Sequence, residues 1–157
     1  RVGLPMDTAV VARKLLSQLR IVCASPAYFA RFGVPRTPEE LVQHNCMCLV
    51  RRRGIFDKWS FEVNGQPREV RVAGTLSSTS SEVLRDWVLG GKGLALLATW
   101  DVGDAVRSGE LQSCLQWCDV IELYAVFVSK RHLPLRIRTF VDHIAEEFGR
   151  LADAGRP

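Results

Sequence analysis

The sequence predicts an α/β fold in which strands alternate with helices. Four short runs of β-branched or other apolar residues have the composition of buried strands: residues 19–24, 46–50, 94–98 and 121–128. Segments with helical periodicity and helix-capping residues lie between these runs. One stretch of strict alternation around Asn64-Gly65 adds a single antiparallel hairpin. Repeated succession of strand and helix is typical of the α/β class.

Local signals mark each element of the first half. Ser25 and Pro26 begin a helix as its N-cap and first residue, and Gly33 ends it. Thr37 and Pro38 repeat this start signal, with acids in the first turn. The hairpin follows, and its apolar residues alternate on both sides of the Asn-Gly turn, at Trp59, Phe61, Val63, Val70 and Val72.

The second half contains three predicted helical segments. The first has an apolar face made of Val83, Leu84, Trp87 and Val88. Gly90-Gly91 stops that helix, and residues 102–109 form a short helix or turn. Pro134 begins the last helix, and residues 151–157 form a tail that we expect to fray. The apolar stripe of the last helix consists of Phe140, Val141, Ile144, Phe148 and Leu151.

Composition indicates an ordinary soluble protein. The chain has 157 residues, of which 47% are apolar and 24% charged, and its net charge is +4. It has neither an apolar run of membrane-spanning length nor a signal peptide, so we expect a cytoplasmic protein without a membrane partner. Two basic clusters, Arg51-Arg52-Arg53 and residues 130–138, are not interleaved with aromatic residues. We interpret them as solvated faces and not as a nucleic-acid surface.

The cysteines predict neither disulfides nor a metal centre. Their number is odd, which favours a reducing compartment; they are Cys23, Cys46, Cys48, Cys114 and Cys118. His44, Cys46 and Cys48 alternate and would share one face of a strand, which is conceivable as part of a metal site. Their spacing is not that of paired zinc ligands, so buried, inert thiols are the preferred interpretation. No metal ion or cofactor is predicted.

No catalytic constellation is visible either. The stretch GGKG follows a helix and lacks the order of a Walker loop. The serines have no nearby histidine or acid in the order that hydrolases use. The sequence therefore predicts a protein that is not an enzyme and has no catalytic residue.

The hydroxyl run from Ser77 to Ser81 is the strongest indication of a ligand. Thr79 with Glu82 fits a capping box, which explains one or two of the hydroxyl groups. The remaining serines lie where a strand leads into a helix, at the carboxyl end of an α/β sheet where ligands usually bind. A helix N-terminus presents free amide donors and a partial positive charge. We therefore expect a small organic anion, most simply a carboxylate, at this place.

Several stretches in order along the chain resemble one family. They are SPAYFARFGVPRTPEELVQHNC, a W-x-F hairpin strand, GTLSSTSSEVLRDWVLGGKGLALL, RSGEL and YAVFVSKRHLPLRIRTFVDHIAEEF. This pattern is similar to the effector-binding domain of LysR-type transcriptional regulators, over about residues 1–150.

The resemblance implies a fold like the type 2 periplasmic binding proteins, with two α/β lobes, two crossover strands and an effector in the cleft between the lobes. Residues 1–19 would be a remnant of the first lobe with a crossover, and residues 20–119 the second lobe. Residues 120–150 would return to the first lobe, which would be incomplete in this chain. A winged helix-turn-helix and a linker helix would precede the segment.

The resemblance also implies effector-binding residues. The family usually has asparagine or a similar polar residue where Thr79 stands, at the mouth of the cleft, and Ser78 and Ser80 flank it. Trp100 would lie on a loop lining the cleft, just beyond Ala98, where the family commonly has proline.

Two arginines complete the expected site. Arg51 ends its strand and could reach an anionic effector, and Arg1 matches an arginine that ends a first-lobe strand and faces the cleft. A further departure from the family pattern is Val128, which stands where proline is common.

The function implied is that of a sensor domain. A small-molecule effector would modulate DNA binding by the winged helix-turn-helix in a homo-oligomeric regulator, a dimer or a tetramer. Three alternatives stay open from the residues: a solute-binding protein of the same fold, an enzyme with Cys48 or a serine as nucleophile, and a ligand-free oligomerisation module.

Overall fold

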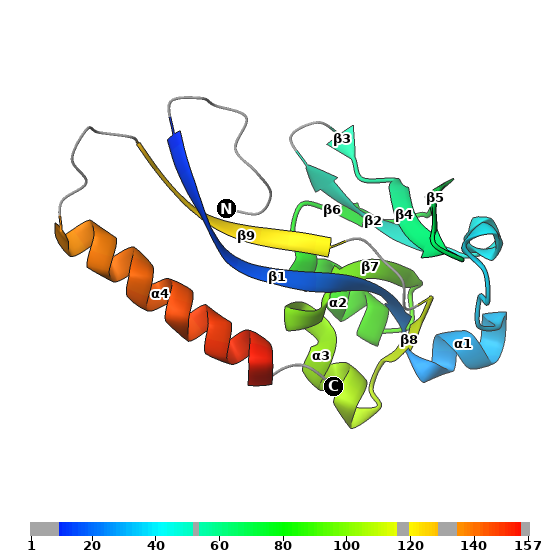
Figure 1. Cartoon of the computed structure of the whole chain (residues 1–157). Coiled ribbons are helices and arrows are strands. Elements are labelled where there is room, and N and C mark those ends of the chain that lie inside the picture. The colour runs from blue at the N-terminus through cyan, green and yellow to red at the C-terminus, as the bar shows by residue number, and fades with distance from the viewer. Residues whose placement is uncertain (1–9, 52–53, 116–119, 129–134, 155–157) are drawn as a thin grey trace. The chain divides into compact units, whose positions relative to one another are not determined.

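The computed structural model describes residues 10–51, 54–115, 120–128 and 135–154, and the chain divides into two compact units. One unit contains Leu19–Asp119, and the other Arg1–Gln18 with Val120–Pro157. The elements are shown in Figure 1. In chain order they are β1 (Val10–Ala24), α1 (Pro26–Phe32), the 3-10 helix η1 (Pro38–Gln43), β2 (Cys46–Arg51), β3 (Gly54–Ile55), β4 (Lys58–Val63), β5 (Gln66–Arg71), β6 (Ser77–Ser78), α2 (Ser81–Leu89), β7 (Leu94–Ala98), α3 (Thr99–Ser108), β8 (Gln112–Cys114), β9 (Val120–Val128) and α4 (Leu135–Ala154).

The unit of residues 19–119 is built on a mixed sheet with the order β3-β2-β7-β1-β8, and β6 also pairs with β2. β2 runs parallel to both β6 and β7, and β1 runs antiparallel to β7 and β8. The segment β6–α2–β7 therefore joins two strands of the same direction through a helix, as expected for the alternation of strands and helices in the sequence.

Apolar clusters cover both faces of this sheet. On one face Trp59 and Phe61 of the hairpin and Tyr28 and Phe29 of α1 pack against alternate strand residues. On the other face residues of α2 and α3 pack against the intervening ones, and this cluster consists of Cys23, Met47, Leu84, Val88, Ala95, Leu97, Val102 and Leu111. All five residues of β7 are buried, as predicted for a strand covered on both sides.

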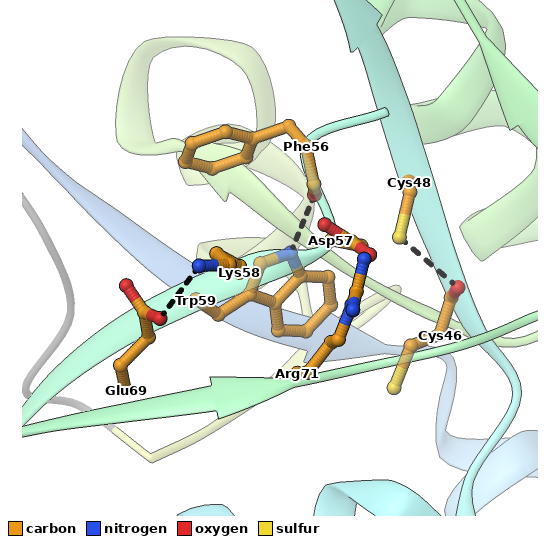
Figure 2. A network of polar contacts seen from close by, with 8 residues as sticks. All are labelled: Cys46, Cys48, Phe56, Asp57, Lys58, Trp59, Glu69 and Arg71. Carbon is orange, nitrogen blue, oxygen red and sulfur yellow. Dashed lines mark hydrogen bonds and ion pairs between the residues drawn. The ribbon is translucent and has the colours of Figure 1, made fainter. Parts of the chain in front are cut away.

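The predicted hairpin is confirmed. β4 and β5 pair in register from Lys58↔Arg71 to Val63↔Gln66. The turn residues Asn64 and Gly65 both have positive φ, 53° and 74°, the conformation that a two-residue hairpin turn requires. Ion pairs join Lys58 to Glu69 and Arg71 to Asp57 across the exposed side (Figure 2).

Helix starts follow the sequence signals with three corrections. Ser25 caps α1 through its Oγ, which accepts from the N–H of Tyr28, and Gly33 ends this helix at φ 82°. The Thr37 side chain makes no capping bond, whereas the Glu40 carboxylate accepts from the N–H of Arg36 at 2.7 Å. The N-cap of α2 is Ser80 and not Thr79. α3 begins at Thr99, three residues earlier than expected.

The other unit contains the first half of β1, together with β9 and α4. β9 was expected to be a central strand, but within the described residues it pairs with β1 alone. The Glu122 carboxylate accepts from Lys14 Nζ at 3.3 Å, Ser17 Oγ at 3.5 Å and the Tyr124 hydroxyl. An ion pair joins Arg13 to Asp142 of α4. None of the described helices is long and apolar enough to span a bilayer.

The predicted stripe of α4 is correct only in part. Val141 is buried, Ile144 and Phe148 are half-buried, but Phe140 is 62% exposed. Phe140 precedes Val141 by one residue, about 100° around the helix, and so leaves the buried face. α4 continues to Ala154, and the side chain of Leu151, residue Pro134 and residues 155–157 lie outside what the structure describes.

Asn45 links the strands of the larger sheet. Its Nδ2 donates to the carbonyl of Lys92 at 2.7 Å, and its Oδ1 accepts from the N–H of Thr75 at 2.8 Å. Its backbone accepts from the N–H of Leu94 and donates to the Tyr28 hydroxyl. One residue thereby sets where the segments leading into β6 and β7 lie relative to the start of β2.

Two glycines make room for this link. A Cβ on Gly74 would overlap the carbonyl of Cys46, and a Cβ on Gly93 would overlap the carbonyl oxygen of Asn45. Both overlaps are with backbone atoms, which cannot move without shifting a strand. Glycine is therefore required at both positions by close approach of the chain.

We expect Asn45→Ala to lower the free energy of unfolding by about 1–2 kcal/mol, because the side-chain hydrogen bonds to the Lys92 carbonyl and the Thr75 N–H are lost. Urea denaturation followed by circular dichroism measures this change. The control is Gln43→Ala, an exposed amide two residues earlier, which should change stability by less than about 0.5 kcal/mol. Equal effects of the two substitutions would contradict the role given to Asn45.

Candidate functional site

Three parallel strands end at one edge of the sheet. Leu49 of β2 is aligned with Ser78 of β6, and Met47 with Ala95 of β7. The carboxyl ends of β2, β6 and β7 therefore point the same way, and α2 and α3 both begin there (Figure 1). This is the edge of an α/β sheet where ligands usually bind.

The hydroxyl run lies at this edge and is already partly hydrogen-bonded. Ser78 Oγ accepts from the N–H of Ser80 at 3.1 Å, and Ser80 Oγ accepts from the N–H of Val83 at 3.5 Å. Each hydroxyl group accepts through a lone pair and keeps its O–H for donation. Ser78 and Ser80 can therefore accept from backbone N–H groups and still donate to an anion. Thr79, between them, is exposed.

The capping box predicted at Thr79 is wrong by one residue. With Ser80 at the N-cap, Glu82 becomes the second helical residue and cannot make the reciprocal bond of a capping box. The N–H groups of Ser81 and Glu82 have no partner within the helix, as in any first helical turn. The first turn of α2 thus presents donors beside the two serine hydroxyls.

The first turn of α3 contributes Trp100 and Asp101. Trp100 is 41% exposed and is the second residue of α3, so it lies on a helix and not on the expected loop. Burial raises the pKa of Asp101, against the opposing effects of a hydrogen bond from Ser81 and the charge of Arg85. Asp101 therefore connects the first turns of α2 and α3.

Arg51 is the last residue of β2 and is exposed. Its Cζ lies 5.1 Å from the centroid of the Phe56 ring, and that of Arg20 lies 4.9 Å from the same centroid. Arg20 is only 6% exposed and is aligned with Ala98, the last residue of β7. Sequence reasoning missed Arg20, although a single arginine in the apolar run LRIVCA was a usable signal.

The structure thus places five of the six predicted site residues on one unit and at one edge: Arg51, Ser78, Thr79, Ser80 and Trp100. Arg1 lies outside the described residues. Asp101, Arg20 and Phe56 are the members of this edge that the sequence did not indicate.

The four described cysteines, Cys23, Cys46, Cys48 and Cys114, are free and buried. Cys46 Sγ donates to the Leu41 carbonyl and Cys48 Sγ to the Cys46 carbonyl (Figure 2). Burial raises the pKa of Cys46 to about 12 and that of Cys48 to about 11, so both remain thiols near neutral pH. Among the described residues no group of three histidine, cysteine or acidic side chains could hold a metal ion. Cys118 lies outside the described residues.

Comparison with known proteins decides the family. The model of the LysR substrate binding domain matches residues 1–149. The chain belongs to this family. LysR regulatory domains have the type 2 periplasmic-binding-protein-like fold, which is therefore the fold of this chain. The family is one of transcriptional-regulator domains and not of enzymes.

Individual relatives and solved structures are also transcriptional regulators or their regulatory domains. The chain is 32% identical over 149 residues to the HTH-type transcriptional regulator DmlR of Escherichia coli K12, covering 94% of this chain and 48% of that protein. The regulatory domain of CrgA from Neisseria meningitidis superposes with a TM-score of 0.78 at 29% identity, over 93% of this chain and 72% of that one. Full-length AphB, a virulence activator of Vibrio cholerae, superposes with a TM-score of 0.77 at 26% identity. The match covers 92% of this chain and 49% of AphB. The chain spans about half the length of the curated relatives it matches.

The position of the cap leads to a stability prediction. We expect Ser80→Ala to lower the free energy of unfolding by about 1 kcal/mol, because α2 loses its capping acceptor. Thr79→Ala, one residue away and exposed, should change it by less than about 0.5 kcal/mol. Denaturant titration of the two variants measures the difference, and a larger loss for Thr79→Ala would restore the original assignment of the cap.

Asp101 gives a prediction about pH. Its folded-state pKa is raised, so its contribution to stability is complete below the pKa of the unfolded chain and is lost as pH rises through the folded-state pKa. Asp101→Asn keeps an oxygen acceptor for Ser81 without the buried charge. The variant should therefore melt higher than the parent near pH 7, and this advantage should shrink towards about pH 4.

Differential scanning calorimetry across that pH range measures the effect. The control is Asp104→Asn on the same helix, which loses an exposed ion pair with Arg107 and should not raise the melting temperature. If the gain in melting temperature from Asp101→Asn grew on acidification, the predicted direction of the Asp101 pKa shift would be wrong.

Proposed function

We propose that this chain is the effector-sensing regulatory domain of a LysR-type transcription factor and that it binds a small organic anion, a carboxylate. The observation that carries the proposal is the gathering of donors at one edge of the sheet. The Ser78 and Ser80 hydroxyls, the first turn of α2 and the Arg51 guanidinium all belong to it.

The chemistry of these groups favours an anion. Serine hydroxyls and helix N-terminal amides donate hydrogen bonds, and the helix dipole adds a partial positive charge. Arg51 adds a full positive charge at the end of the neighbouring strand. Trp100, half-exposed at the first turn of α3, offers an apolar surface to the non-polar part of the same ligand. Arg1 completes the proposed binding residues.

Regulation would follow from differential affinity. A ligand shifts a conformational equilibrium only by as much as it prefers one state over the other. In the proposed regulator the effector changes the population of two conformations, and this change reaches a winged helix-turn-helix that contacts DNA. The regulator would act in the cytoplasm as a dimer or tetramer of identical subunits, without a cofactor or a membrane partner.

A thermal-shift screen of small carboxylates and aromatic acids tests the proposal. A ligand that binds the folded state raises the melting temperature by mass action, and a concentration of about 100 times Kd adds about 2.7 kcal/mol of stability. At least one acid should raise the melting temperature while its neutral amide does not. A panel in which amides are as effective as acids would contradict the preference for an anion.

A pair of substitutions at Ser80 tests whether the ligand binds at the start of α2. Aspartate and asparagine both cap helices as well as serine does, so Ser80→Asp and Ser80→Asn should preserve α2. Ser80→Asp adds a negative charge beside the proposed carboxylate and should weaken its binding at least about tenfold, whereas Ser80→Asn should stay within about threefold.

Isothermal titration calorimetry with an acid found by the screen measures both affinities. Each variant is melted in parallel to verify that the cap is intact. Equal affinity of the aspartate and asparagine variants would show that the ligand does not bind at the N-terminus of α2.

A further inference from the structure

Phe56 contacts two arginines at the same edge of the sheet. The guanidinium carbons of Arg20 and Arg51 lie 4.9 Å and 5.1 Å from the centroid of its ring. Both distances fall within the range of about 6 Å over which an aromatic ring attracts a cation. One ring therefore holds two positive charges that would otherwise repel each other. We call these three residues the Phe56 stack.

The backbone of Phe56 is fixed. Its N–H donates to the Leu49 carbonyl of β2 at 2.8 Å, and its own carbonyl accepts from Trp59 Nε1 at 3.1 Å (Figure 2). Trp59 is 1% exposed in the core. These two bonds fix the backbone of Phe56, and its half-buried ring packs against the core cluster that contains Trp59. The ring can therefore serve as a rigid support for a flexible arginine.

The two arginines have different surroundings. Arg20 is 6% exposed and lies opposite Ala98, so its charge is screened little by water. Arg51 is exposed, and its head group is free to contact a solute. Of the two guanidinium groups, the exposed one of Arg51 is therefore the group that can contact a ligand.

Acidic side chains of the described residues leave Arg51 available. Asp57 is next to Phe56 in sequence, but its carboxylate accepts from Arg71 Nε at 2.7 Å (Figure 2). Among the described residues no carboxylate forms an ion pair with Arg51. Its fork of N–H donors matches the two oxygens of a carboxylate.

We propose that Phe56 is a positioning residue, which holds the Arg51 guanidinium in place for two-pronged binding of a ligand carboxylate. The proposal rests on the proposed function, because it takes the ligand to bind at this edge. It adds the source of selectivity: a planar, charged carboxylate is preferred over the amide of the same shape.

The first experiment needs no ligand. The Nε–H resonance of Arg51 is assigned by its loss in Arg51→Lys, and its order parameter is measured by 15N relaxation. Phe56→Leu keeps an apolar side chain without a ring and should make the Arg51 Nε–H markedly more mobile. The matched control is Phe32→Leu, which removes an exposed ring that lies 5.0 Å from Arg31 on α1 and should leave Arg51 unchanged. Unchanged order of Arg51 in Phe56→Leu would overturn the positioning role.

The second experiment titrates acetate and benzoate, with acetamide and benzamide as neutral matches, into the same 15N-labelled proteins. The acids should shift the Arg51 Nε–H resonance and the amides should not. Phe56→Leu should weaken binding of the acids about two- to fivefold, the size of one cation–π contact at an exposed site. Arg51→Lys, which keeps the charge but loses the fork, should weaken it further, and Phe32→Leu should have no effect.

The outcomes separate the two proposals. If the acids shift the amides of Ser78–Ser80 with equal affinity in the parent and Phe56→Leu, the role of Phe56 is overturned and the proposed function stands. If no acid shifts either Arg51 or Ser78–Ser80, both are overturned. Thermal melting of every variant verifies the fold, and Phe56→Met, which also keeps the bulk without a ring, replaces Phe56→Leu if that variant does not fold.

Discussion

The hydrogen bonds of Asn45 are the constraint on which the candidate site depends. One side chain holds the Lys92 carbonyl and the Thr75 N–H, and so connects the start of β2 with the segments that lead into β6 and β7. Strands of a parallel set have no short turn to fix their relative levels. Asn45 fixes the relative positions of these strands at their amino ends. Gly74 and Gly93 pack there against the backbone at residues 45 and 46. Because the register of β6 and β7 against β2 is set in this way, Arg51, Ser78 and Ala98 lie at the same edge of the sheet.

The distribution of polar groups follows from the same arrangement. Both faces of the larger sheet are covered by apolar clusters, so hydrogen-bonding groups that must remain available collect at the strand ends. Half-buried hydroxyl groups there are bonded to the backbone: Ser78 and Ser80 each accept an N–H and keep one donor. The edge is thus preorganised, and a ligand would meet donors whose positions are set by strands and helix starts and not by mobile loops.

Features decided by neighbouring residues could be predicted from the sequence, and features decided by distant ones could not. The hairpin and the buried strand β7 follow from alternation, a two-residue turn and a continuous apolar run. The cap of α2 was placed one residue early because Thr79 and Ser80 are both good caps by type, and the bond that identifies Ser80, its Oγ accepting from the N–H of Val83, is seen only in the structure. Asn45 was missed because its partners lie 30 and 47 residues away. Phe56 was missed for the same reason, since Arg20 meets it only after the sheet has formed.

The pKa values of the thiols in the core and of Asp101 at the edge bear on what the edge can do chemically. Proton transfer near neutral pH requires a group whose pKa lies close to the working pH. The thiols of Cys46 and Cys48 are moved far from that range by burial, and they lie in the core. Asp101, whose pKa is raised, is engaged by Ser81 and Arg85 and connects two helix starts. The described residues of the edge also supply fixed donors and the positive charges of the Phe56 stack, which can hold an anion. Such a set of groups is suited to holding an anionic ligand, which is what the proposed sensor function requires.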